Sequence, residues 1–189
     1  MAKPKIGILA LQGDFEAHRD ALARAGAEGV EIRSASGLAS IDALIIPGGE
    51  STTMLKLIEE ERLFDALEEF GAKKPVFGTC AGAILLASEV VNPVQHSLSL
   101  MDFTIERNAY GRQVDSRIAG IDLEGRKTEA VFIRAPVIRR VGPNAKVLAS
   151  YQGAPVLVEQ GKHLAATFHP ELSGDEQIHR RFVEKIRAA

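Results

Sequence analysis

The chain contains one cysteine, Cys80, and its neighbours suit a catalytic nucleophile. It stands at the centre of the run Gly78-Thr79-Cys80-Ala81-Gly82, after the apolar residues 75–77 and before the helix-like run 83–87. A nucleophile with a glycine two residues away on each side, between strand and helix, is typical of a nucleophile elbow, because small neighbours permit the sharp turn. Helix-terminal N–H groups around the sulfur would favour its thiolate form. The alternative is that Cys80 is a small buried apolar residue.

A thiol nucleophile needs a base, and the base needs a group that orients it. The run Phe168-His169-Pro170-Glu171-Leu172, at the end of the last expected strand, contains both residue types. In an extended chain, side chains two residues apart point to the same side. We therefore expect Glu171 to hold one imidazole nitrogen of His169 and the other nitrogen to face the sulfur of Cys80.

The other four histidines lie in patterns that suggest no catalytic role. His18 and His179 fall in amphipathic helix patterns, so we expect both on the surface. His96 lies in an expected loop and His163 beside an expected turn, where solvated imidazoles are common. The histidines lack the spacing of a ligand set and no second cysteine is present, so no metal site is expected.

Two further segments carry groups that suit acyl chemistry. In Pro47-Gly48-Gly49-Glu50-Ser51, after a buried strand, paired glycines leave backbone N–H groups free to stabilise an oxyanion. The alternative for this segment is a plain turn with Ser51 as the helix cap. The segment 106–113 is rich in polar donors, and one of its guanidinium groups could bind a substrate carboxylate with two parallel bonds. The alternative for it is a solvated loop.

These residues need a scaffold, and the first half of the chain alternates buried strands with amphipathic helices. We expect strands at 6–10, 30–32, 43–46 and 76–77, and helices at 15–25, at 52–70 and after Cys80. The apolar residues of the 52–70 segment recur at three- and four-residue intervals, which is typical of a helix. Continuous apolar strands between helices indicate a parallel sheet that is covered on both faces.

The second half has short expected strands at 103–105, 130–133, 146–149 and 156–159, without long helices between them. Gln160-Gly161-Lys162 is expected to turn the last of these into a hairpin with 164–168, and a final helix is expected at 175–186. The sum is a three-layer α/β domain whose sheet is mostly parallel at first and mixed later. Ligands bind at the carboxyl ends of strands in such sheets, and Cys80 lies at one of these ends.

Length and composition favour one globular domain. The chain has 189 residues, 46% of them hydrophobic and 25% charged, and we expect a single domain over residues 1–189. A net charge of -2 gives no reason to expect a nucleic acid or an anionic membrane as a partner. One cysteine cannot form an internal disulfide, and the apolar run near the N-terminus is too short for a signal peptide, so we expect a cytoplasmic protein.

Three motifs carry a resemblance to a known group of enzymes. In their order, the Gly-Gly-Glu-Ser turn at 48–51, the elbow around Cys80 and the His-Pro-Glu run at 169–171 resemble those of class I, triad-type glutamine amidotransferases. Further segments resemble one branch of that group, the glutaminase subunits of two-component pyridoxal 5'-phosphate synthases. These segments are Leu9-Ala10-Leu11-Gln12-Gly13, 47–54, 106–116 and Phe132-Ile133-Arg134-Ala135-Pro136. The resemblance covers nearly the whole chain. It departs modestly at Arg117, where an aromatic residue is common, and in the length of the loop 92–97.

The resemblance implies a fold, an activity and a set of site residues. The fold is the three-layer, flavodoxin-like class I glutamine amidotransferase fold, and the activity is hydrolysis of L-glutamine to L-glutamate and ammonia without a cofactor or a metal. Cys80 is the implied nucleophile, His169 the acid and base, and Glu171 the orienting group. The N–H groups of Gly49 and Ala81 are the implied oxyanion donors. The implied contacts to L-glutamine come from Gly48, Gly49, Glu50, Ser51, Arg107, Ile133 and Arg134.

The resemblance also implies a partner, a synthase subunit that receives the ammonia within a large hetero-oligomer and makes pyridoxal 5'-phosphate. Three alternatives remain open. The chain could serve histidine or purine synthesis, although the segments 107–116 and 133–136 argue against that. It could be another cysteine hydrolase on a similar fold, but such enzymes do not need the His-x-Glu pair. It could be a non-catalytic module, but such relatives usually lose a member of the triad.

Overall fold

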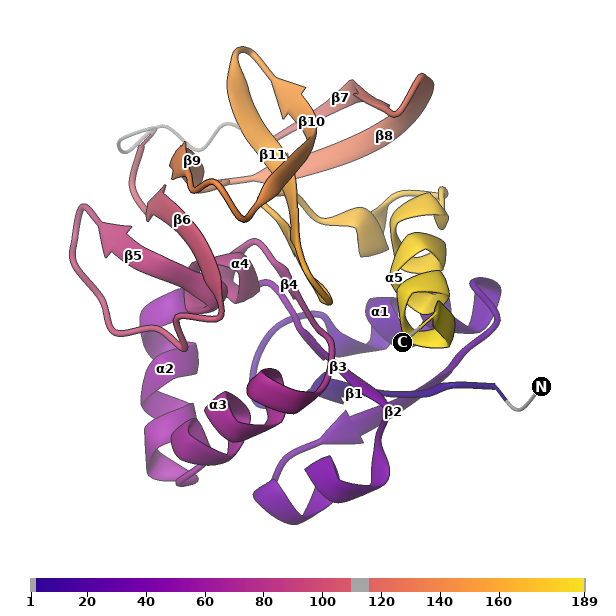
Figure 1. Cartoon of the computed structure of the whole chain (residues 1–189), viewed down its shortest axis with the longest axis vertical. Helices are drawn as coiled ribbons and strands as arrows, with labels where there is room; N and C mark the ends of the chain where they lie inside the picture. Colours follow the sequence, from indigo (N-terminus) through magenta and orange to yellow (C-terminus); the bar gives the residue numbers. More distant parts are fainter. Residues whose placement is uncertain (1–2, 110–115, 189) are drawn as a thin grey trace.

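A seven-stranded sheet forms the centre of the fold in the computed structural model, which describes residues 3–109 and 116–188. Residues 110–115, which belong to the polar segment singled out above, lie outside the described residues. The strand order is β10-β11-β12-β4-β3-β1-β2 (Figure 1). In chain order these strands are β1 (Lys5–Leu9), β2 (Glu28–Ile32), β3 (Ala43–Ile46), β4 (Val76–Thr79), β10 (Lys146–Tyr151), β11 (Ala154–Gln160) and β12 (His163–Ala166).

Most of this sheet is parallel. The neighbouring strands β2, β1, β3, β4 and β12 run parallel, and β11 and β10 are added antiparallel at one edge. The parallel part has the order of flavodoxin-like sheets, with β12 as its fifth strand. The expected turn at Gly161 joins β11 and β12 as a hairpin, with Gln160 opposite His163. The mixed, mostly parallel sheet is therefore confirmed.

Helices cover both faces of the central sheet (Figure 1). Helices α1 and α5 pack on one face, and α2, α3 and α4 pack on the other. In β3, Leu44 and Ile46 face the second group of helices while Ile45 faces the first, as strand alternation requires. The three-layer architecture is confirmed. The helices are α1 (Phe15–Arg24), α2 (Ser51–Glu60), α3 (Phe64–Lys73), α4 (Ala81–Leu86) and α5 (Gln177–Ala188), with short 3-10 helices η1 (Ala35–Ser40) and η2 (Pro170–Leu172).

The expectation of one helix over 52–70 is wrong, because α2 and α3 are separated by a break at Arg62. Arg62 has a left-handed backbone (φ 54°), and its N–H donates to the Glu59 carbonyl at 3.0 Å. The Leu63 N–H donates to the Ile58 carbonyl at 2.8 Å, which completes a Schellman motif. The apolar periodicity continues across the break because Leu63 is itself buried, and no glycine or proline marks the position.

Two smaller sheets lie beside the central one. A three-stranded sheet has the order β5-β6-β9, and β7 pairs with β8 as a long antiparallel hairpin. The apolar runs predict β6 and β8 but not β5, β7 or β9. Strand β7 has no apolar run because most of its side chains are at least partly exposed. The bounds are β5 (Ala87–Val91), β6 (Met101–Glu106), β7 (Ser116–Leu123), β8 (Arg126–Ile133) and β9 (Val137–Val141).

The carboxyl ends of β3, β4 and β12 lie side by side at one edge of the central sheet, because these strands are parallel neighbours. The glycine turn 47–51 follows β3, Cys80 follows β4, and the segment 168–172 comes two residues after the end of β12. The fold therefore brings together three of the segments that the sequence patterns single out.

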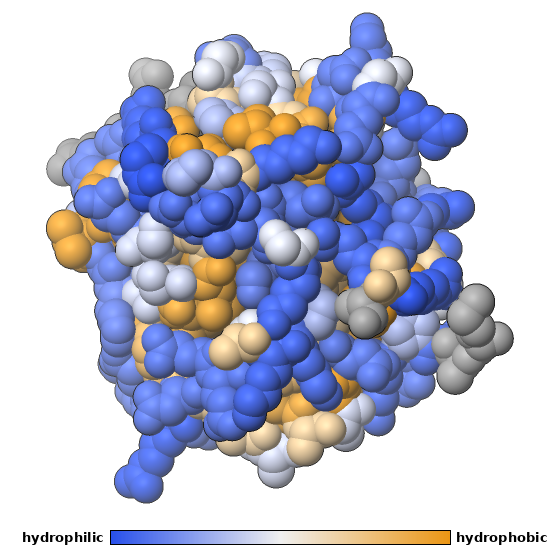
Figure 2. Space-filling view, in the orientation of Figure 1, coloured by the Kyte–Doolittle hydropathy of each residue, from blue (hydrophilic) through white to orange (hydrophobic). Residues whose placement is uncertain are grey.

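The face of the molecule that Figure 2 shows is dominated by polar side chains. Figure 2 shows one face that is mostly hydrophilic, with small apolar patches between the polar groups. Among residues 3–109 and 116–188, no helix is both long and apolar enough to cross a membrane.

Candidate active site

Cys80 lies on a tight turn between β4 and α4. Its backbone has a positive φ (φ 49°, ψ -105°), which is unfavourable for a residue with a side chain, and its N–H donates to the Ala166 carbonyl at 2.8 Å. The two flanking residues must be glycines, because neither position has room for a side chain. A Cβ on Gly78 would lie 2.5 Å from the backbone of Gly82, and a Cβ on Gly82 would collide with the Ile46 carbonyl oxygen. The elbow geometry that the glycine spacing predicts is therefore present.

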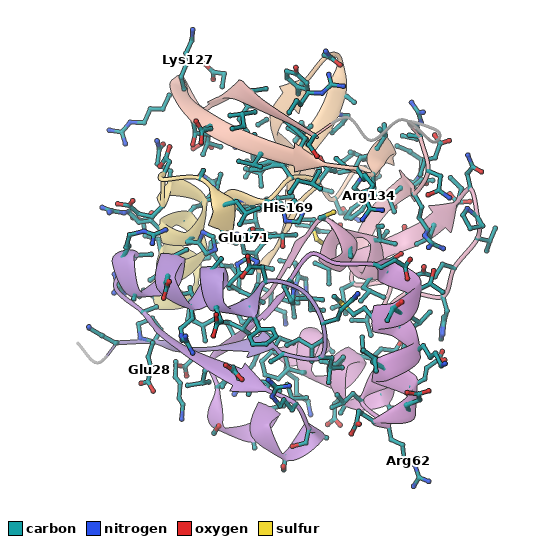
Figure 3. The ribbon with its side chains drawn as sticks, turned by 180° about the vertical axis from the view of Figure 1, so that it is seen from behind. Glu28, Arg62, Lys127, Arg134, His169 and Glu171 are labelled. Atoms are coloured by element: carbon teal, nitrogen blue, oxygen red, sulfur yellow. The ribbon has the colours of Figure 1, made fainter. Side chains whose placement is uncertain are left out.

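His169, which is partly buried, pairs with the buried Glu171 beside Cys80. The His169 Nδ1 atom lies 2.8 Å from Glu171 Oε1. Figure 3 shows both side chains near the centre of the molecule. The condition of an extended chain is not met here, because β12 ends at Ala166 and Pro170–Leu172 form η2. The turn, rather than strand alternation, brings the carboxylate back to the imidazole.

The charge on His169 is set by its two neighbours. Burial lowers the pKa of His169, but hydrogen bonds and charges from Cys80 and Glu171 outweigh burial and raise the pKa to about 10. The imidazole is therefore protonated at neutral pH. With Nδ1 bound to Glu171, Nε2 is the ring nitrogen left to face the sulfur of Cys80. The pair can thus deliver a proton on the side of the nucleophile.

Cys80 and His169 line a cavity of about 210 Å³. Ile84, Asn108 and Pro136 also line it, and the sequence assigns none of these three a role in the site. A second cavity, of about 370 Å³ between η1 and α3, contains none of the expected site residues. Most of the residues expected to bind substrate or to stabilise the oxyanion share the lining of the first cavity, namely Gly49, Glu50, Ser51, Ala81, Arg107, Ile133 and Arg134.

Glu50, rather than Ser51, caps helix α2. Its carboxylate accepts from the Thr52 N–H at 3.1 Å and from the Thr53 N–H at 2.7 Å. Burial raises the pKa of Glu50, but the hydrogen bonds from Thr53 and Thr52 outweigh burial and lower the pKa to about 2, so the side chain is a carboxylate. The interpretation of Ser51 as the cap is wrong. Its hydroxyl instead donates to Gln95 Oε1 at 3.0 Å.

Two guanidinium groups line the cavity. The Nη2 of Arg107 donates to Thr52 Oγ1 at 2.6 Å and lies 3.4 Å from Glu50 Oε1, which ties this side chain to the first turn of α2. The Nε of Arg107 is buried and has no hydrogen-bond partner among the described residues. Arg134 is exposed and has a left-handed backbone (φ 44°). Both cations are placed to meet an anionic group in the cavity.

The glycine turn after β3 packs against the same imidazole. Gly48 is not part of the cavity lining, and a Cβ on it would collide with Cε1 of His169. Gly49 has φ 148°, and a Cβ on it would lie 2.8 Å from Gln12 Oε1, the atom that accepts from the Glu50 N–H at 3.1 Å. Gln12 therefore holds the turn in place, a role that sequence patterns do not assign. The contact of Gly48 with glutamine and the oxyanion role of Gly49 stay predictions.

Three of the other histidines are buried, and the expectations for them are wrong. His18 and His179 are wholly buried rather than on the surface. Each lies on the buried face of its helix, and the spacing of its apolar neighbours is the signal that points there. His163 accepts from the Val76 N–H at 3.2 Å, and chiefly burial lowers its pKa to about 4. His96 is exposed, as expected. Within residues 3–109 and 116–188, no three His, Cys, Asp or Glu side chains are grouped to hold a metal ion.

We predict that His169 titrates near pH 10 and that Glu171→Gln lowers this pKa, because the amide keeps the shape of the side chain but not its charge. NMR titration of histidine-labelled protein measures both values. His163, with a pKa of about 4, is the internal control that the substitution leaves unchanged. An unchanged titration of His169 in the Glu171→Gln protein would contradict the orienting role of Glu171.

Comparison with known proteins agrees with the chemistry that the geometry of the site supports. A profile of the SNO glutamine amidotransferase family matches residues 8–188. Two similar proteins carry the name pyridoxal 5'-phosphate synthase subunit PdxT. The one from Solibacter usitatus (strain Ellin6076) is 58% identical and covers 96% of this chain and 99% of its own length. The one from Koribacter versatilis (strain Ellin345) is 53% identical and covers 97% of this chain and 96% of its own length.

A solved structure of a similar protein has the same fold. A crystal structure described as a glutamine amidotransferase superposes with a TM-score of 0.90 at 48% identity, and the match covers 96% of this chain and 98% of that one. The class I glutamine amidotransferase fold that the motifs imply is therefore confirmed. The chain belongs to the SNO glutamine amidotransferase family.

Proposed function

We propose that this chain hydrolyses L-glutamine to L-glutamate and ammonia, with Cys80 as nucleophile, His169 as acid and base, and Glu171 as the group that orients His169. One observation carries the proposal. The single cysteine, on a strained turn, shares a cavity with an imidazole that a buried carboxylate holds. Membership of a glutamine amidotransferase family supports the choice of substrate.

The reaction begins when the Cys80 thiolate attacks the side-chain amide carbon of glutamine. The amide oxygen becomes an oxyanion, which the N–H groups of Gly49 and Ala81 would stabilise. Ala81 is the first residue of α4, so its N–H has no acceptor within that helix. Protonated His169 gives a proton to the departing nitrogen, because an amide anion is too basic to leave. Ammonia leaves, and a γ-glutamyl thioester remains on Cys80.

Water completes the cycle. Part of the high pKa of His169 comes from Cys80, so the imidazole holds a proton less tightly once the sulfur is acylated. Neutral His169 then removes a proton from water, which attacks the thioester carbon. The carbon–sulfur bond breaks, glutamate is released, and both side chains return to their starting charges. One glutamine and one water become one glutamate and one ammonia.

The charges around the cavity fit a free amino acid. Glu50 is a carboxylate that can pair with the α-ammonium group, and Arg107 and Arg134 can pair with the α-carboxylate. The Nε of Arg107 is a buried donor without a partner in the described part of the chain, so a bound carboxylate would satisfy it. Ile84 and Ile133 offer apolar surface to the methylene groups.

We further propose that the ammonia passes to a synthase subunit for pyridoxal 5'-phosphate synthesis, within a large hetero-oligomer. Two relatives at 58% and 53% identity, matched over nearly their whole length, are named subunits of that synthase. The same identities argue against the alternative of histidine or purine synthesis. We also propose that residues 1–189 act as one glutaminase domain in the cytoplasm, where a reducing environment would keep Cys80 a free thiol.

Cys80→Ala is expected to abolish glutamate release and to leave the fold intact, because the thioester cannot form and alanine fits the same turn. Rates of glutamate and ammonia formation, together with the circular dichroism spectrum, measure the two effects. Glu171→Gln is the variant for comparison. Its loss of glutaminase activity is expected to be smaller, because the imidazole is misoriented rather than removed. A folded Cys80→Ala protein with the wild-type rate would overturn the assignment.

Hydrolysis is expected to be slow in the isolated chain and severalfold faster with the synthase subunit, because ammonia released into water is lost to the pathway. Glutamate release with and without the purified synthase subunit measures this coupling. The matched control combines the Cys80→Ala chain with the synthase and an ammonium salt, and product formation is expected from the free ammonia alone. Equal rates of glutamate release with and without the synthase would refute the coupling.

A further inference from the structure

Two more imidazoles, those of His18 and His179, lie in a buried row behind the His169–Glu171 pair. His18 Nε2 lies 3.4 Å from Glu171 Oε2 and 3.2 Å from Thr79 Oγ1. His18 Nδ1 lies 2.9 Å from His179 Nε2. His18, Thr79 and His179 are 0% exposed, so none of these groups can replace its partner with bulk water.

The second carboxylate oxygen of Glu171 shows why a donor is needed there. Its Oε1 is bound to His169, but its Oε2 is buried and makes no hydrogen bond to any described residue. A buried carboxylate oxygen without a donor is costly. The Nε2 of His18 lies 3.4 Å from this oxygen and 3.2 Å from Thr79 Oγ1, so its N–H is placed to serve both acceptors.

The imidazoles of His18 and His179 are both neutral, so each carries a single ring proton. Burial, and then the charges of His179 and His169, lower the pKa of His18 well below its usual value. Burial, and then the charge of Arg24, lower the pKa of His179 to about 3. A neutral His18 therefore donates from one ring nitrogen and accepts at the other.

The surroundings decide which nitrogen carries the proton. With the proton on Nε2, His18 donates toward Glu171, and its bare Nδ1 accepts from the Nε2–H of His179. With the proton on Nδ1, the bare Nε2 could accept from the Thr79 hydroxyl, but Glu171 Oε2 would be left without a donor. His179 would then keep its proton on Nδ1, an atom without a partner in the described part of the chain. Orphaned buried N–H groups are rarer than unpaired acceptors, so the first arrangement is favoured.

We propose that His18 is a positioning residue for the hydrolysis proposed above, on which this inference rests. Its Nε2–H holds Glu171 against His169, and His179 fixes the tautomer that makes this contact possible. The active groups then form one row from Cys80 through the imidazole and the carboxylate to the two buried histidines. Helices α1 and α5, which carry these histidines, thereby set the orientation of the imidazole in the cavity.

Two closely related variants of the full-length chain separate a donor role from a structural one. In His18→Gln the amide reaches as far as Nε2 and can donate to Glu171. In His18→Asn the amide reaches only as far as Nδ1, so it can contact His179 but not Glu171. Both variants place a neutral amide in the same buried site. His163→Gln, at the other end of β12 from the cavity, controls for the loss of a buried imidazole.

We expect His18→Asn to lower kcat for glutamine hydrolysis about tenfold or more with KM within about twofold, because a charge-assisted hydrogen bond is lost. His18→Gln is expected to stay within about threefold of the wild-type kcat. The control His163→Gln is expected to keep the wild-type rate.

The NMR titration of His169 is the second readout. The titratable groups beside it are Cys80, Glu171 and His18, and we expect its pKa to fall in His18→Asn but not in His18→Gln. The charged groups of the cavity are the same in every variant, namely Glu50, Arg107 and Arg134.

Wild-type rates in folded His18→Asn protein, with an unchanged His169 pKa, would overturn the role. Equal losses in His18→Asn and His18→Gln with an unchanged His169 pKa would overturn it as well, because they would show a structural effect only. If the wild-type chain releases no glutamate from glutamine, either alone or with the synthase subunit, the proposed function fails. The His169 titration alone then decides whether His18 positions Glu171.

Discussion

The hydrogen bond between His169 Nδ1 and Glu171 Oε1, at 2.8 Å, is the interaction on which the rest of the site depends. It occupies one ring nitrogen and leaves the other for Cys80. Without it the imidazole could rotate, and its proton would no longer be aimed at the nucleophile or the departing nitrogen. The carboxylate also contributes to the raised pKa of His169, so the same contact sets both the direction and the charge of the imidazole.

Backbone contacts from distant elements hold this pair in place. The His169 N–H donates to the Val131 carbonyl at 2.8 Å, and the Cys80 N–H donates to the Ala166 carbonyl at 2.8 Å. Gly48 packs against the imidazole ring, where a side chain would collide. The parallel strands β3, β4 and β12 bring these contacts to one edge of the sheet. The fold thus fixes the site mainly through its backbone, which leaves the cavity walls free to carry charged side chains for binding.

The features that sequence patterns predict have causes within a few residues, and those that they miss depend either on distant partners or on local backbone geometry that residue types do not show. The glycines around Cys80 and the spacing of His169 and Glu171 belong to the first kind. His18 belongs to the second, because its partner His179 is 161 positions away and no local pattern shows that the two imidazoles satisfy each other. The break at Arg62 is closed by backbone bonds that need no glycine, so periodicity alone predicts a single helix. Sequence patterns also fail to show that Glu50 rather than its neighbour Ser51 caps α2, because the choice depends on the local geometry of the turn.

The most direct test is covalent labelling by a glutamine analogue that carries a chloroketone in place of the side-chain amide, read by peptide mass spectrometry. If Cys80 and His169 act as proposed, one label per chain is expected on the peptide that contains the single cysteine. Glutamine is expected to protect against this labelling, and His169→Gln is expected to slow it. Labelling that glutamine does not slow, or that proceeds equally fast in the His169→Gln protein, would contradict the proposed site.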